Sequence, residues 1–159
     1  MAITIQIEKK GEWEQLRYIG PINEDAEVHL TPFVQGLGPN VVVNFRQVEY
    51  VNSCGVRAWI NFLRDMEKGR KVIFEECTPE IVNQINMIPN FRSTAHLKSV
   101  YGSYACDNCD HHQWQMFEEG KNLPTNLAGG LPVVKCEKCN HDMEMEELED
   151  EFFAWLSAS

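Results

Sequence analysis

The chain has 159 residues, of which 43% are hydrophobic and 24% are charged. This composition suits one medium or two small globular domains and excludes collagen-like, coiled-coil and wholly disordered proteins. Fourteen basic residues against 24 acidic ones give a net charge of -10, so the chain repels phosphate backbones, and we expect no direct nucleic-acid partner.

The N-terminal stretch has neither the basic flank nor the apolar core of an export signal. No apolar run in the chain approaches the roughly 20 residues that a membrane span needs. The sequence therefore predicts a cytoplasmic protein without membrane insertion.

The charge is distributed unevenly along the chain. Residues 1–93 carry 10 basic and 12 acidic side chains, whereas residues 94–159 carry 4 and 12. A change of composition of this kind indicates a domain boundary. We therefore predict two domains, residues 1–93 and residues 94–159.

The first domain opens with a pattern typical of strands. Ile3, Ile5 and Ile7 alternate with polar residues, and a second strand-like stretch covers residues 13–19. Together these stretches predict a hairpin. Residues 20–38 have partly helical spacing, so we expect them to be mostly helical.

From residue 40 onward, strand patterns alternate with helix patterns. Residues 40–45 and 72–76 are short apolar runs typical of buried strands. Residues 53–68 carry a helical apolar stripe, and a second helix is predicted after Thr78, with Pro79 at its first position. This order predicts an α/β domain in which helices cover a mixed sheet with parallel pairs.

Two short motifs carry a family resemblance. Residues 20–23 (GPIN) stand in the place of a Gly-x-Leu-Asp motif, and residues 50–56 (YVNSCGV) stand in the place of an apolar-Asp-Ser-Ser/Thr-Gly-Leu loop. In the order and spacing of these motifs, residues 1–92 resemble a STAS domain, the fold shared by anti-sigma-factor antagonists and the cytoplasmic ends of sulphate transporters.

The resemblance implies a partner-docking or regulatory loop at the start of the helix, formed by Asn52, Ser53, Cys54, Gly55 and Arg57. In the antagonists, the Ser or Thr directly before the glycine is phosphorylated, and this modification releases the partner kinase. Cys54 occupies that position here, and Asn52 replaces the usual Asp. The usual switch is therefore not expected unless Ser53 takes it over.

Three interpretations of this loop stay open on the sequence alone. In the first, Asn52 or Ser53 merely caps the helix, and Cys54 packs as a small apolar group. In the second, the loop docks a protein partner and stays permanently in its unmodified, binding-competent state. In the third, Cys54 is a redox switch, because a helix N-terminus favours the reactive thiolate.

Four of the six cysteines form two Cys-x-x-Cys pairs. Cys106 and Cys109 are separated from Cys136 and Cys139 by 26 residues. Four thiolates complete the tetrahedral shell of Zn²⁺, so the sequence predicts one structural zinc ion per chain. A thioredoxin-like dithiol and an iron–sulfur centre are the alternatives. A shell of four cysteines has no open position, so we expect no catalysis by this metal.

The region around the two pairs resembles a zinc ribbon. We expect strands at residues 97–104, 113–117, 132–135 and 143–145, and an amphipathic C-terminal helix whose pattern begins at residue 144 and runs to residue 156. Three nearby histidines are expected to stay outside the metal shell: His111, His112 and His141.

No catalytic motif emerges from the sequence, so we expect a protein that is not an enzyme. The family resemblance implies non-enzymatic protein binding in bacterial signalling, with a kinase-type anti-sigma factor or another signalling component as the partner. The alternative is an architectural or assembly subunit, such as a STAS-like accessory protein of a transporter complex. A second copy of the chain, forming a homodimer, is a further candidate partner.

Overall fold

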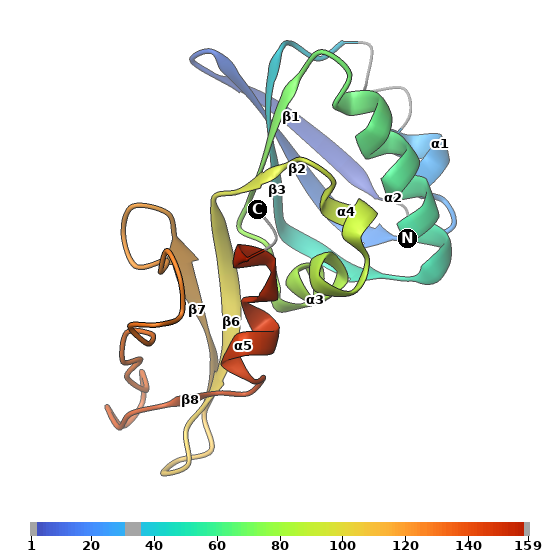
Figure 1. Cartoon of the computed structure of the whole chain (residues 1–159). Helices are drawn as coiled ribbons and strands as arrows, with labels where there is room; N and C mark the ends of the chain where they lie inside the picture. The colour runs from blue at the N-terminus through green and yellow to red at the C-terminus, as the bar shows by residue number, and fades with distance from the viewer. Residues whose placement is uncertain (1–2, 31–35, 158–159) are drawn as a thin grey trace.

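The computed structural model describes residues 3–30 and 36–157, which form two β-sheets (Figure 1). The larger one, the first sheet, has the strand order β1-β2-β3-β4-β5. β1 runs antiparallel to β2, and each of the other neighbouring pairs is parallel. The strands are β1 (Thr4–Lys10), β2 (Trp13–Ile22), β3 (Asn40–Val51), β4 (Lys71–Glu75) and β5 (His96–Leu97).

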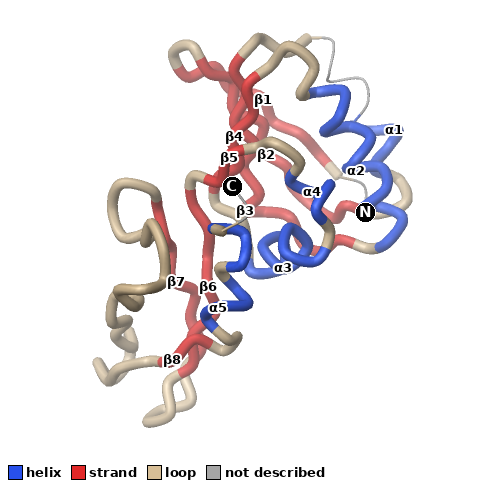
Figure 2. The backbone as a smooth tube through the Cα atoms, in the orientation of Figure 1, coloured by secondary structure: helices blue, strands red, loops and turns tan. Residues whose placement is uncertain are grey.

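Four helices cover one face of the first sheet (Figure 2). The longest of them buries the predicted stripe, including Trp59 and Leu63. The third begins after Thr78, whose hydroxyl accepts the backbone N–H of Ile81 at 3.3 Å. The helices are α1 (Ala26–Leu30), α2 (Ser53–Met66), α3 (Pro79–Met87) and α4 (Pro89–Arg92). The predicted mixed sheet covered by helices is therefore confirmed.

Among the described residues, no helix combines the length and the apolar character needed to cross a lipid bilayer.

Two predicted boundaries in this half of the chain are wrong. The described residues of the stretch 20–38 are not mostly helical, because β2 continues to Ile22 and α1 covers only Ala26–Leu30. Residues 31–35, which the helical prediction also included, lie outside the described part. β3 extends beyond residue 45 to Val51, because it continues to pair with β2 across two register shifts, as far as the pair Ile22 and Val51.

An aromatic cluster fills the core between the first sheet and α2. The ring of Trp59 is fully buried, and its centroid lies 5.4 Å from that of Phe45 and 5.8 Å from that of Phe74. Its indole N–H donates to the carbonyl of Phe91 at 2.8 Å. This bond ties α4 to α2, and the buried rings fix α2 against the sheet.

The second sheet has three antiparallel strands in the order β7-β6-β8. Strands therefore occur near three of the four predicted positions. The fourth, residues 132–135, is wrong as a strand, because that stretch contributes only an isolated bridge between Lys135 and Asp142 within the described residues. The strands are β6 (Ser99–Ala105), β7 (His112–Glu118) and β8 (Glu144–Met145).

The predicted C-terminal helix over residues 144–156 is also too long. Glu144 and Met145 pair with β6 as β8 instead of beginning the helix. The helix α5 (Glu149–Phe152) and the 3₁₀ helix η2 (Ala154–Leu156) follow. We call residues 149–156 the C-terminal segment; its rings Phe152, Phe153 and Trp155 are buried.

The two sheets share one hydrophobic core. Cys77, two residues after the end of β4, forms a parallel bridge with Val100 of β6. The core that contains Trp59 and Phe74 continues without interruption to Phe117 of β7 and to the C-terminal segment. β5 lies in the first sheet although it follows residue 93, and the domain boundary between residues 93 and 94 stays a prediction.

Phe153→Ala is expected to lower the free energy of unfolding of the whole chain by about 3–5 kcal/mol. Phe153 is buried, and its ring meets those of Phe117 at 5.3 Å and Phe152 at 4.8 Å, both edge-on. Chemical unfolding followed by tryptophan fluorescence and circular dichroism measures this effect.

Leu148→Ala is the matched control, because Leu148 is 64% exposed, and it is expected to change stability by no more than about 0.5 kcal/mol. If Phe153→Ala produced an early transition that left the unfolding of the first sheet unchanged, the shared core would not be a single cooperative unit.

Candidate metal centre and docking loop

Four cysteine sulfurs come together beyond the end of β6. The Sγ atoms of Cys106, Cys109, Cys136 and Cys139 all lie within 4.8 Å of one another. Cys106 and Cys139 lie 3.4 Å apart, and Cys109 and Cys136 lie 3.5 Å apart. Four thiolates at about 2.3 Å from a tetrahedral metal are separated by about 3.8 Å. The donor set and its spacing therefore suit a metal ion.

Two backbone turns of the same geometry carry the cysteine pairs. In each turn the N–H of the first cysteine donates to the carbonyl of a following histidine, His111 at 2.9 Å and His141 at 2.8 Å. The carbonyl of the first cysteine accepts from Asp110 in one turn and from Asn140 in the other, both at 2.9 Å. The same hydrogen bonds thus place both pairs of thiols around one point.

Asp110 and Asn140 have φ values of 60° and 62°, in the left-handed region that Asp and Asn tolerate better than most residues. The sequence prediction rests on the cysteines and overlooks these two positions. The repeat Cys-x-x-Cys-Asp/Asn-His was the signal that identifies them.

Backbone N–H groups favour the thiolate form of two of the four cysteines. The pKa of the Cys139 thiol is lowered to about 5, first by the backbone N–H of His141 and then by the side chain of Asn108. The backbone N–H of His111 lowers the pKa of Cys109 in the same way, but burial and the three neighbouring thiols raise it overall to about 12. The N–H of Lys138 also donates to the sulfur of Cys136 at 3.4 Å. Because metals bind thiolates and not thiols, these donors prepare the site for a cation.

The histidines near the turns have other contacts. Nδ1 of His112 lies 2.6 Å from a carboxylate oxygen of Glu146, and Nδ1 of His141 lies 3.2 Å from the carbonyl oxygen of Cys139. In the part of the chain that the structure describes, the group of potential metal ligands contains the four cysteines and no histidine.

The second candidate site is the docking loop, residues 52–57. The side chain of Asn52 accepts the N–H of Gly55 at 2.8 Å and donates to the carboxylate of Glu24 at 2.9 Å. Its backbone N–H donates to the carbonyl of Ile22 at 3.1 Å. Asn52 therefore caps α2 and fastens it to the end of β2.

Gly55 fixes the same contact sterically. A Cβ atom at this position would lie 1.8 Å from the carbonyl oxygen of Ile22 and 2.7 Å from the backbone nitrogen of Asn23. Backbone atoms of Ile22 and Asn23 cannot move aside as the end of a flexible side chain can. Only glycine therefore allows α2 to approach β2 so closely.

Three of the predicted docking residues lie on the surface. Ser53, Cys54 and Arg57 are exposed, and together with Glu24 and Ala58 they line a shallow groove of about 320 Å³. Asn52 and the buried Gly55 hold this surface in place. Glu24 is not among the predicted residues, although an acidic residue directly after the GPIN motif is a visible signal.

Glu24 adds negative charge beside the start of α2. Its pKa is lowered, first by the hydrogen bond from the side chain of Asn52, so the carboxylate stays ionised at neutral pH. The groove thus places an anionic Glu24 near the cationic Arg57, with a hydroxyl and a thiol among its lining groups.

No family model matches the chain, and no curated protein matches it in sequence. Its fold is similar to the crystal structure of an anti-sigma factor antagonist from Mycobacterium paratuberculosis, at 19% identity and a TM-score of 0.50, over 60% of this chain and 84% of the other. The unphosphorylated form of the anti-sigma factor antagonist SpoIIAA is also similar, at 19% identity and a TM-score of 0.43, over 59% of this chain and 86% of the other. About 60% of the chain therefore has the STAS fold, as the sequence predicts.

Proposed function

We propose that the protein is a non-enzymatic, protein-binding signalling module of the anti-sigma-factor-antagonist type, and that it docks its partner through the start of α2. The observation that carries this proposal is the docking loop: Ser53, Cys54 and Arg57 are exposed on a helix start that Asn52 and Gly55 hold rigidly. A preorganised surface binds a partner without the cost of ordering a loop.

The chemistry of this surface suits a polar protein partner. Arg57 offers charge-assisted hydrogen bonds, and the first turn of a 14-residue helix attracts an acidic group. Cys54 has no hydroxyl group to accept a phosphate. The position that is phosphorylated in the antagonists would therefore stay unmodified in this protein. Ser53 has the exposed hydroxyl of this loop and is the residue whose phosphorylation would alter docking.

We also propose that the four cysteines bind one zinc ion with a structural role. Cys106, Cys109, Cys136 and Cys139 would fill its tetrahedral shell, which leaves no position for a substrate. By binding thiolates from both turns, the ion would hold the two turns together. The two turns would depend on such a constraint, because most of their residues apart from Cys106 and Cys136 are exposed.

Ser53→Asp and Cys54→Asp are each expected to weaken partner binding about tenfold, because a new carboxylate would enter the interface beside Glu24. The measurement is affinity capture from the source cell with the tagged full chain, followed by titration of the identified partner.

Lys68→Gln is the matched control for these variants. It also makes the net charge more negative by one unit, but Lys68 lies beyond the other end of α2 and its side chain is 74% exposed. Equal affinity of the Ser53, Cys54 and Lys68 variants for every captured partner would reject the docking surface.

Protein purified without added metal is expected to contain about one zinc ion per chain. Cys136→Ser should abolish this content and lower the midpoint of thermal unfolding, because it removes one of the four thiolates. Cys54→Ser is the control and should keep the metal, since Cys54 is exposed at the start of α2, outside the four-sulfur group.

Elemental analysis and thermal unfolding before and after chelation provide the two readouts. A protein that folds with the same stability when metal-free would contradict the structural role. Iron accompanied by sulfide in place of zinc would instead identify an iron–sulfur centre.

A further inference from the structure

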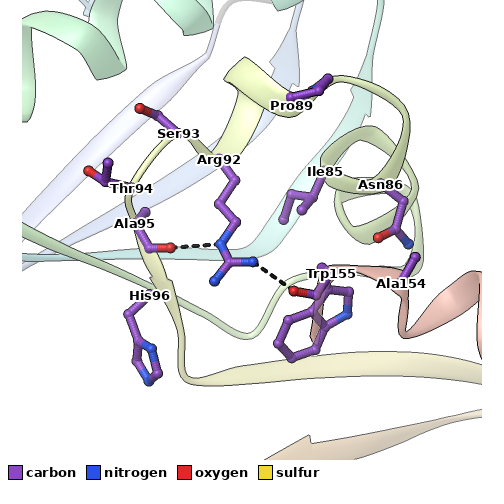
Figure 3. A pocket seen from close by; sticks show the side chains of 10 residues that line it. All are labelled: Ile85, Asn86, Pro89, Arg92, Ser93, Thr94, Ala95, His96, Ala154 and Trp155. Atoms are coloured by element: carbon purple, nitrogen blue, oxygen red, sulfur yellow. Dashed lines mark hydrogen bonds between the residues drawn. The ribbon is translucent and has the colours of Figure 1, made fainter. Parts of the chain in front are cut away.

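A pocket of about 690 Å³ lies between α3, α4, the stretch that leads into β5, and the C-terminal segment (Figure 3). Ile85, Pro89 and Ala154 give it apolar walls, and the guanidinium of Arg92 lies beside Trp155 in it. Its size is that of pockets that hold small molecules. It shares no lining residue with the groove at the docking loop.

Arg92 brings an unneutralised cation to this pocket. Nε donates to the carbonyl of Ala95 at 2.8 Å, and Nη1 donates to the carbonyl of Trp155 at 3.0 Å. These two bonds hold the guanidinium in place, and its Cζ lies 5.9 Å from the centroid of the Trp155 ring. Neither the carbonyl groups nor the ring carries a full negative charge to balance it. Within residues 3–30 and 36–157, no carboxylate forms an ion pair with Arg92 and no acceptor meets its Nη2 group.

Two acidic side chains contact other lining residues. One carboxylate oxygen of Glu67 accepts the hydroxyls of Ser93 and Thr94, both at 3.0 Å, and its other oxygen is buried without a hydrogen bond in the described part of the chain. Glu119 forms a short contact with the ring of His96. The guanidinium is also half-buried, so burial makes its lack of a counter-ion costly.

Two further polar atoms in the wall have no partner. Nε1 of Trp155 and Oδ1 of Asn86 are buried without a hydrogen bond in the described part of the chain. The side-chain nitrogen of Asn86 donates to the carbonyls of Glu151 and Phe152 at 3.1 and 2.9 Å. Because both carbonyl groups need an N–H donor, the bonded end of the Asn86 amide is its nitrogen, and the unpaired end is its oxygen. Buried polar atoms of this kind are normally paired, so they indicate a missing partner.

We propose that this pocket binds a small molecule that carries an oxyanion, a phosphate or a carboxylate, with the oxyanion paired to the guanidinium of Arg92. Planar guanidinium groups bind such anions with two parallel hydrogen bonds. The apolar body of the ligand packs against Pro89 and Ile85, and small rotations bring the indole N–H of Trp155 onto an acceptor atom. The proposal does not rest on the docking function proposed above.

The placement of the pocket gives ligand binding a structural consequence. Arg92 belongs to α4, whereas Ala154 and Trp155 belong to η2 in the C-terminal segment. A ligand between them bridges two parts of the chain that are far apart in sequence. Because a ligand stabilises the state that binds it, occupancy strengthens the attachment of the C-terminal segment.

Phenyl phosphate and benzoate are the probes, and benzyl alcohol is their neutral control. Each is titrated into the metal-loaded full chain while the indole N–H signals of the four tryptophans are followed by NMR. We expect both anions to shift the Trp155 signal saturably, with Kd values of about 1 mM for such small ligands. The probe that binds more tightly identifies the natural group as a phosphate or a carboxylate.

Ala154→Asp tests the position of the anion. Ala154 is exposed in the pocket wall, so the variant should fold, and its carboxylate should pair with Arg92 and weaken both anions at least about tenfold. Ala154→Asn has the same size without the charge and should bind almost as wild type.

Three results would overturn the proposal. The first is the absence of saturation at Trp155 up to about 10 mM of either anion, ten times the expected Kd. The second is equal affinity for benzyl alcohol, and the third is equal affinity of the Asp and Asn variants. Shifts confined to Trp13 or Trp114 would assign binding to another surface and would also count against it.

Discussion

The backbone bridge at Cys77 joins the two sheets, and the rest of the structure depends on it. Its N–H donates to the carbonyl of Ser99 at 3.1 Å, and its carbonyl accepts from Tyr101 at 2.8 Å. The side chain is fully buried. Burial, aided by the charge of Glu75, raises the pKa of the thiol well above its ordinary value. Cys77 is therefore a neutral packing group, chemically distinct from the four clustered cysteines.

This bridge connects the four-cysteine cluster to the shared core, to which Cys106 and Cys136 belong. The second turn leads from Cys136 into β8, which pairs with β6, and β6 is bonded to Cys77. From β8 the chain continues into the C-terminal segment, which Asn86 of α3 holds by two hydrogen bonds. The turns thus connect to the first sheet by two short routes.

The features that the sequence predicted are those with a local cause. The apolar stripe of α2, the cap at Thr78 and the spacing of the cysteines are each encoded within a few residues, and each appears in the structure. The docking loop was found through its likeness to known motifs. Its rigidity could not be foreseen, because the contact between Gly55 and Ile22 joins residues that only the fold brings together.

The errors have the opposite cause. β3 continues to Val51 because it pairs with β2 along that length. Residues 144–145 form a strand because they pair with β6. In both places pairing with a distant strand overrides the local pattern. The pocket at Arg92 lies beyond any sequence argument, since Arg92 and Trp155 are 63 residues apart. Only the closed core places the C-terminal segment beside α4.

The carboxylate of Glu24 would influence the effect of a phosphate group on the docking loop. Its ionised carboxylate already accepts from Asn52 at the start of α2, where the helix dipole favours negative charge. A phosphate on Ser53 would gain from the same dipole but would meet repulsion from Glu24, so it would compete for the side chain of Asn52. Because Asn52 also caps the helix through Gly55, that competition acts on the loop geometry as well as on its charge. Modification at Ser53 would therefore reshape the docking surface, whereas Cys54 contributes only its thiol.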